Sequence, residues 1–174
     1  MKHILTIIIL GFLISGCSEK KTNNEPNIQS LLVQQLENAH TNQQWFVPTK
    51  KAVDGLTLEQ SNWKDSTDNH SIGELVSHLI FWNELNLKAF KGEKVTDIND
   101  ENKNKETFKI NNGKDWQNAV SKLDSIQTEW ERLTKNATDE QIADWNVEIA
   151  NMSAHTAYHT GQIIYIRKMN GWWK

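Results

Sequence analysis

The chain has 174 residues, of which 37% are hydrophobic and 24% are charged, proportions that fit one folded domain and exclude a mostly disordered chain. Lysine and arginine number 19 against 22 for aspartate and glutamate, so the formal net charge is −3 and no nucleic-acid partner is expected. The single cysteine excludes a disulfide scaffold and a zinc site built from cysteines, which leaves histidine, carboxylate, tyrosine and hydroxyl groups to carry any chemistry.

The first segment has the pattern of an export signal. Lys2 gives it a positive start, an apolar run extends over residues 4–14, and small residues precede Cys17. The run is shorter than the roughly 20 apolar residues that span a bilayer, which favours a secretory signal; an uncleaved anchor helix is the alternative. Residues 14–17 (ISGC) also resemble the lipobox of bacterial lipoproteins, which implies cleavage before Cys17 and attachment of diacylglycerol to its thiol.

We therefore expect three parts: a lipoprotein signal peptide over residues 1–16, a lipid-anchored polar tether over residues 17–27 and a folded domain over residues 28–174. The tether is polar, contains a proline and has no periodicity, as flexible linkers do. This organisation predicts a protein attached to the membrane of the bacterial cell envelope. Ser18 follows the cysteine where an aspartate would favour the inner membrane, so the resemblance favours the outer membrane.

Helical periodicity dominates the domain, and no stretch alternates as a half-buried strand does. The periodicity predicts four helices, over about residues 28–45, 71–91, 114–135 and 151–169. Ser71 and Glu74 have the spacing of a capping box at a helix start, and shorter helical turns are expected at Thr57 and Thr138. Residues 93–113 form a polar crossover. The sequence therefore predicts an all-α fold, most simply an up-down four-helix bundle.

Three histidines lie on the apolar stripes of two predicted helices. His155 and His159 are four residues apart, so their Cβ atoms stand ~5–6 Å apart on one helix face and both imidazoles can converge on one ion. His78 lies on the stripe of the second helix. Three neutral imidazoles can hold a metal ion and leave one coordination position open. The alternative is three core histidines, each satisfied by a hydrogen bond.

The spacing of His155 and His159 is also that of the zinc-protease HExxH helix, but Thr156 stands where that motif has its glutamate. A metalloprotease would therefore lack its general base. The catalytic group is left unassigned, and a water or thiol activated at the metal is the expected nucleophile.

Side chains close to these histidines are candidates for a binding pocket. Trp82 can wall the pocket or pack in the core. Tyr158 can donate to a metal-bound oxygen, although a core aromatic with a solvated tip is favoured. Gln162 can orient a ligand or bind substrate, although an interhelical hydrogen bond is favoured. Gly161 weakens the helix by ~1 kcal/mol relative to alanine, which predicts close contact with another helix there.

Three charged or titratable residues are expected to have no part in the site. His40 lies at the edge of the first helix's stripe and is expected to be exposed rather than a fourth ligand. Arg167 lies near a helix C-terminus, where a cation favours the helix dipole, and needs no further role. His70 is expected to be solvated.

Two segments resemble the DinB/YfiT-like superfamily: residues 71–78 (SIGELVSH) and residues 154–163 (AHTAYHTGQI), of which the second is the more specific. The resemblance covers about residues 28–173 and implies a four-helix bundle whose metal ligands are His78, His155 and His159. It further implies zinc or nickel, homodimers in many members, and transfer of small thiols in some of them. The lipobox departs from the mostly cytosolic members.

The sequence thus favours an exported, metal-dependent enzyme of the hydrolase or thiol-transferase type that acts on a small molecule. Export argues against thiol transfer, because small-thiol cosubstrates are cytosolic. A non-catalytic module that binds a metal or small ligand at the cell envelope is the second hypothesis, and a purely structural bundle without metal is the third.

Overall fold

A computed structural model describes residues 27–95, 101–109 and 115–173. These residues contain seven α-helices, one 3₁₀ helix and no strand, which confirms the predicted all-α class. The predicted signal peptide, Cys17 and the tether up to residue 26 lie outside the described residues. No helix in the described part is both long and apolar enough to cross a membrane.

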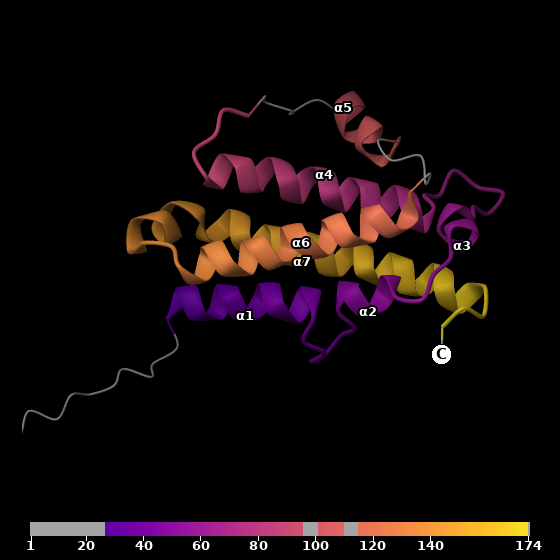
Figure 1. The fold of residues 1–174 in the computed structure, drawn as a ribbon, viewed down its shortest axis with the longest axis horizontal. Coiled ribbons are helices and arrows are strands. Elements are labelled where there is room, and N and C mark those ends of the chain that lie inside the picture. The colour runs from indigo at the N-terminus through magenta and orange to yellow at the C-terminus, as the bar shows by residue number, and fades with distance from the viewer. Residues whose placement is uncertain (1–26, 96–100, 110–114, 174) are drawn as a thin grey trace, which may run out of the picture.

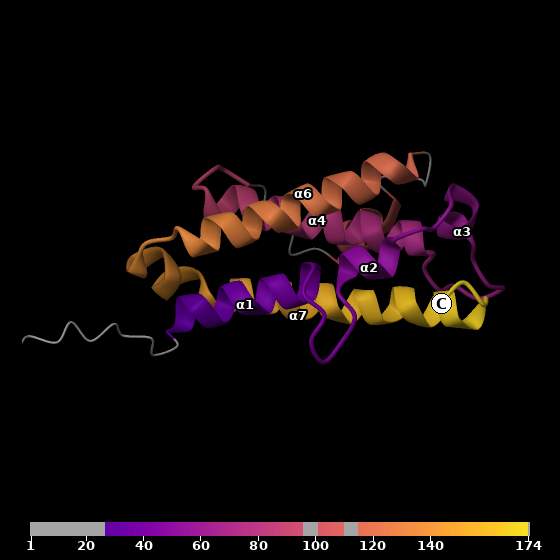
Figure 2. The same cartoon turned by 60° about the horizontal axis from the view of Figure 1, so that its bottom comes forward.

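Four long helices lie side by side and form the body of the molecule (Figures 1 and 2). They are α1 (Ile28–His40), α4 (Ile72–Phe90), α6 (Trp116–Lys135) and α7 (Asp139–Met169). Short helices occupy the connections: α2 (Thr49–Val53), α3 (Leu58–Asn62), α5 (Glu101–Glu106) and the 3₁₀ helix η1 (Thr107–Lys109). Figure 1 shows α5 lying on the outer side of α4.

Neighbouring helices in this body form two parallel pairs. Figures 1 and 2 show α4 and α6 running in one direction, while α1 and α7 run in the other. The Ser153 hydroxyl of α7 donates to the Gln35 carbonyl of α1 at 2.8 Å, and the hydroxyls of Thr49 and Thr160 lie 2.7 Å apart further along. The order is therefore up, down, down, up, rather than the simple up-down alternation that the sequence predicted, because α6 begins at the same end of the molecule as α4.

Capping boxes begin α3, α4 and α7, at the three places where the sequence predicts a helical first turn. In each, the hydroxyl of the capping residue accepts a hydrogen bond from the backbone N–H of the residue three positions later. The side chain of that later residue in turn accepts from the backbone N–H of the capping residue. The pairs are Thr57–Gln60, Ser71–Glu74 and Thr138–Gln141.

Two predicted helix bounds differ from those observed. The first helix ends at His40 rather than near residue 45, and Trp45 is fully exposed in the loop that follows. Its apolar stripe stops at Ala39, so the polar residues beyond have no core to pack against. The last helix begins at Asp139 rather than near residue 151, because no glycine or proline interrupts the intervening residues.

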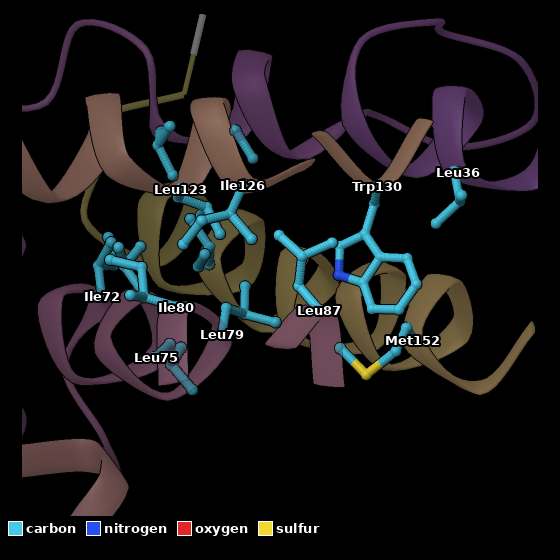
Figure 3. Close-up of a cluster of buried hydrophobic side chains, with 14 of the residues drawn as sticks. Leu36, Ile72, Leu75, Leu79, Ile80, Leu87, Leu123, Ile126, Trp130 and Met152 are labelled. Carbon is cyan, nitrogen blue, oxygen red and sulfur yellow. The ribbon is translucent and has the colours of Figure 1, made fainter. Parts of the chain in front are cut away.

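The core draws apolar side chains from all four long helices. Trp130 of α6 is completely buried, and its indole N–H donates to the Asn83 carbonyl of α4 at 3.1 Å. Figure 3 shows Leu36, Leu87 and Met152 around its ring. Because an indole buries a large apolar area, this residue ties α1, α4 and α7 to α6.

His40 is buried, so the prediction that it is exposed is wrong. Only 2% of the residue is accessible. Its Nδ1 lies 2.6 Å from a Glu131 carboxylate oxygen and its Nε2 lies 2.8 Å from one of Asp124, while Lys50 lies 2.9 Å from the same Asp124 oxygen. The imidazole thus bridges α1 to two carboxylates of α6.

Arg167 is also buried, and the prediction that it has no further role is wrong. Its Nη1 donates to the carbonyls of Ala52 and Asp54 at 2.6 and 2.9 Å, and its Nη2 donates to that of Trp172 at 3.1 Å. The guanidinium carbon lies 4.9 Å from the centre of the Trp173 ring. Arg167 therefore fastens the end of α7 to α2 and to the following turn.

Gly161 makes no close helix contact, contrary to the prediction. A Cβ built at this position would meet no atom within 4 Å. Gly161→Ala is therefore expected to raise the free energy of unfolding by about 1 kcal/mol, because alanine favours the helix more than glycine does. Urea unfolding followed by circular dichroism measures the change.

Gly73→Ala is the matched control for this substitution. A Cβ at Gly73 would lie 3.2 Å from the Ser61 carbonyl oxygen, so this variant should gain less stability or lose some. An equal gain at both positions would contradict the argument.

Candidate metal centre

Three imidazoles converge where α4 packs beside α7. His78 comes from α4, whereas His155 and His159 lie one turn apart on α7. The Nε2 atom of His155 lies 3.1 Å from that of His78 and 3.0 Å from that of His159. His78 and His159 are buried and His155 is half-buried. The three histidines singled out in the sequence therefore form one cluster.

Hydrogen bonds on the far side of two rings fix their tautomers. The Thr107 hydroxyl donates to the Asn104 carbonyl at 2.7 Å, so its oxygen accepts from Nδ1 of His78 at 2.5 Å. The side-chain Oε1 of Gln162 accepts from Nδ1 of His159 at 2.6 Å. With the proton on Nδ1, each ring directs an Nε2 lone pair into the cluster.

This donor set fits a divalent metal ion. Without a metal, a proton on Nε2 of His155 can form a hydrogen bond with the Nε2 lone pair of either His78 or His159, but not with both. The other lone pair then has no donor. Around an ion with bonds of ~2.0–2.1 Å, tetrahedral ligand nitrogens stand roughly 3.4 Å apart, close to the separations observed. The three histidines can therefore hold a divalent metal ion.

The cluster is also in the protonation state that metals require. Burial, together with the charges of the neighbouring imidazoles, lowers the pKa of His78 to about 3 and that of His155 to about 4. Burial likewise lowers the pKa of His159, although the hydrogen bond with Gln162 acts in the opposite direction. The rings are therefore neutral near pH 7, and a metal need not displace protons to bind them.

The cluster opens into a cavity of about 380 Å³, which we call the metal-side cavity. Its walls include two of the histidines, and the lining residues are His78, Trp82, Asn104, Asn151, Met152 and His155. The Trp82 indole N–H donates to the Asn104 side-chain oxygen at 3.1 Å, which fixes both groups at its edge. Sequence reasoning did not single out Asn104 or Asn151.

The other two predicted pocket residues lie elsewhere. Tyr158 and Gln162 line a separate cavity rather than the one beside Trp82. Tyr158 is 64% exposed, so the prediction of a core aromatic is wrong. Gln162 bonds to His159 within its own helix instead of between helices. Its role is to orient an imidazole.

The crossover contributes residues that sequence reasoning missed. Thr107 and Phe108 of η1 are buried against α4. The Phe108 ring stacks on His78 with centroids 3.9 Å apart, and His70 stacks on its other face at 3.7 Å. His70 is nevertheless exposed, as predicted, with 43% of its side chain accessible. A lone phenylalanine in a polar crossover was the available signal, since such a residue seeks an apolar contact.

Thr107→Val is expected to weaken metal binding by about 10–100-fold, because it removes the hydrogen bond that orients His78. Competition with a chromophoric chelator measures the affinity.

Thr134→Val is the matched control, because Thr134 is equally buried and its hydroxyl has no partner among the described residues. It should leave metal affinity unchanged and preserve or raise stability. Equal losses of affinity in both variants would contradict a role for Thr107 in orienting the ligand.

A helical body with three convergent imidazoles defines a protein that can hold a divalent metal ion. Comparison with protein-family models matches residues 48–163 to the DinB superfamily. The match covers more than half of the chain and includes all three histidines, so the chain belongs to the DinB superfamily. No curated protein and no solved structure gives a significant match.

Proposed function

We propose that this chain is a metal-dependent enzyme of the DinB superfamily that acts on a small molecule. His78, His155 and His159 would hold one zinc or nickel ion. The observation that carries the proposal is the convergence of three imidazoles: Nε2 of His155 lies 3.1 Å from that of His78 and 3.0 Å from that of His159, and the latter two are fixed as lone-pair donors. When bound, the ion would act as a Lewis acid and favour a nucleophilic water or thiol near neutral pH.

The chain's own side chains would bind and orient the substrate. Trp82 and Met152 give the metal-side cavity apolar walls, and Asn104 and Asn151 present amide groups to a polar substrate. No carboxylate is among the residues that line this cavity in the described part of the chain. A hydrolase or a thiol transferase would therefore take its nucleophile from solvent or from a cosubstrate.

The absence of a lining carboxylate also favours a second candidate, a non-catalytic module that holds the metal or a small ligand. Elemental analysis of the purified protein, followed by hydrolase and thiol-transfer assays on its apo, zinc and nickel forms, separates the two. One bound metal with turnover that is lost in His155→Ala supports the enzyme. One bound metal without turnover on any substrate supports the module, and no bound metal excludes both the metal-dependent enzyme and a module that holds the metal.

We further propose that the domain is anchored to the bacterial envelope, in the outer membrane, through diacylated Cys17. The residue pattern at positions 1–18 supports this, and a homodimer is the assembly that the family resemblance suggests. Intact mass of the membrane fraction should show a diacylated Cys17 as the first residue, whereas an unmodified Met1 would contradict it. Light scattering of detergent-purified protein tests the dimer.

A further inference from the structure

A second and larger cavity lies beyond Gln162. It has a volume of about 590 Å³, within the range of small-molecule sites, and none of the three clustered histidines lines it. The outer face of α7 and the segment 63–70 form its walls. We call it the aromatic cavity, and its lining residues include Trp63, Asp65, Asp68, Tyr158, Gly161 and Tyr165.

Three aromatic rings line this cavity. Tyr158 and Tyr165 are 64% and 66% exposed, whereas Trp63, on the segment before α4, is half-buried and packs edge-to-face against Trp172. Neither tyrosine hydroxyl has a hydrogen-bond partner among the residues with described side chains. Large rings held at a concave surface provide contact area and an attractive face for a cation.

Gly161 keeps the cavity open. It lines the cavity, and a Cβ at this position would meet no atom within 4 Å. Gly161 is therefore required neither for close packing against another helix nor for a backbone conformation that other residues cannot adopt. The consequence of having no side chain here is free space beside Tyr158 and Tyr165.

The fixed charges that line the cavity are negative. Asp65 and Asp68 are among its residues, and no lysine or arginine is. Hydrogen bonds from Thr67 and Asn69 hold the pKa of Asp65 below its ordinary value, so its carboxylate is ionised near pH 7. Asp68 has no ion-pair partner within the described ranges. His70 also lines the cavity, but its ring stacks on Phe108 and its Nδ1 lies 3.6 Å from a Glu74 oxygen.

We propose that the aromatic cavity binds a small organic cation, with its ammonium group beside Asp65 and Asp68 and its apolar or aromatic body among Trp63, Tyr158 and Tyr165. The site is distinct from the metal-side cavity and does not require the metal.

Isothermal titration of the full chain with 2-phenylethylammonium chloride tests the proposal. We expect saturable binding of one equivalent with a Kd below about 1 mM, and binding at least about tenfold weaker for neutral 2-phenylethanol and anionic 3-phenylpropionate. Binding must persist in His155→Ala, since an amine that binds through the metal would be lost there. No saturable binding, or equal binding of the alcohol, would overturn the proposal.

Substitutions inside and outside the cavity test whether the cation binds there. Asp68→Asn should weaken binding by about tenfold, whereas Asp144→Asn, which removes an exposed carboxylate of α7 outside the cavity, should not change it. Gly161→Leu should abolish binding without loss of thermal stability, because leucine favours the helix more than glycine does and its Cβ would meet no atom within 4 Å. Undiminished binding in Gly161→Leu would show that the ligand lies elsewhere.

Discussion

His155→Ala is expected to lower the affinity for zinc and nickel by more than about 100-fold, which exceeds the usual effect of losing a residue that only orients a ligand. The reason is geometric: the Nε2 atom of His155 lies within 3.1 Å of both other Nε2 atoms, so its loss leaves only two donors. Competition with a chromophoric chelator at pH 7.5 measures the change.

His70→Ala is the matched control for this substitution. His70 lies close by, stacked on Phe108, but it is not part of the cluster of three imidazoles. Its removal should change metal affinity by less than about threefold, far below the effect expected at a residue that orients a ligand. Similar losses in the two variants would indicate a general disturbance of the fold and would count against the proposed ligand set.

His40→Ala is expected to lower the free energy of unfolding by about 3 kcal/mol at pH 6, because it leaves two carboxylates of α6 without their shared partner. Burial alone would lower the pKa of His40, but the hydrogen bonds and charges of Glu131 and Asp124 outweigh it and raise that pKa. The stabilisation is therefore complete below the unfolded pKa of about 6.5 and is lost as pH rises through the higher folded value.

Urea unfolding of the wild type and His40→Ala at pH 6 and pH 9 tests both the size and the sign of this effect. The difference between the two proteins should be smaller at pH 9. His70→Ala, at a histidine whose side chain is 43% exposed, serves as the control and should lower the free energy of unfolding at pH 6 by less than His40→Ala does. A difference that grows with pH would mean that His40 is held in its neutral form.

Local sequence patterns predicted the helices and the histidine pair well. The three capping boxes depend on residues three positions apart, and His155 and His159 depend on the helical repeat alone. Both signals are local, so no knowledge of packing was needed. His78 was predicted as a metal ligand for the same reason, but only the packing of α4 against α7 brings it close to His155 and His159.

Contacts between distant segments account for the failures. His40 and Arg167 are buried because α6 supplies carboxylates to one and α2 supplies carbonyls to the other. Thr107 reaches His78 from a crossover whose composition indicated only a polar loop. Tyr158 is exposed, although the predicted metal ligands His155 and His159 lie within three residues of it on the same helix. Periodicity gives the angle of a side chain around its own helix, but it does not give which element lies opposite.

The uninterrupted course of α7 has a consequence for how this protein could diversify. The helix is roughly 45 Å long at 1.5 Å per residue, and it carries His155, His159 and Gly161 on one stiff rod. Residues of α7 line both cavities. A bend in α7 that changed the shape of one cavity would therefore also change the other. Changes in the molecules that each cavity admits would instead arise in the segments across from α7: residues 63–70 for one, and α5, which supplies Asn104, for the other.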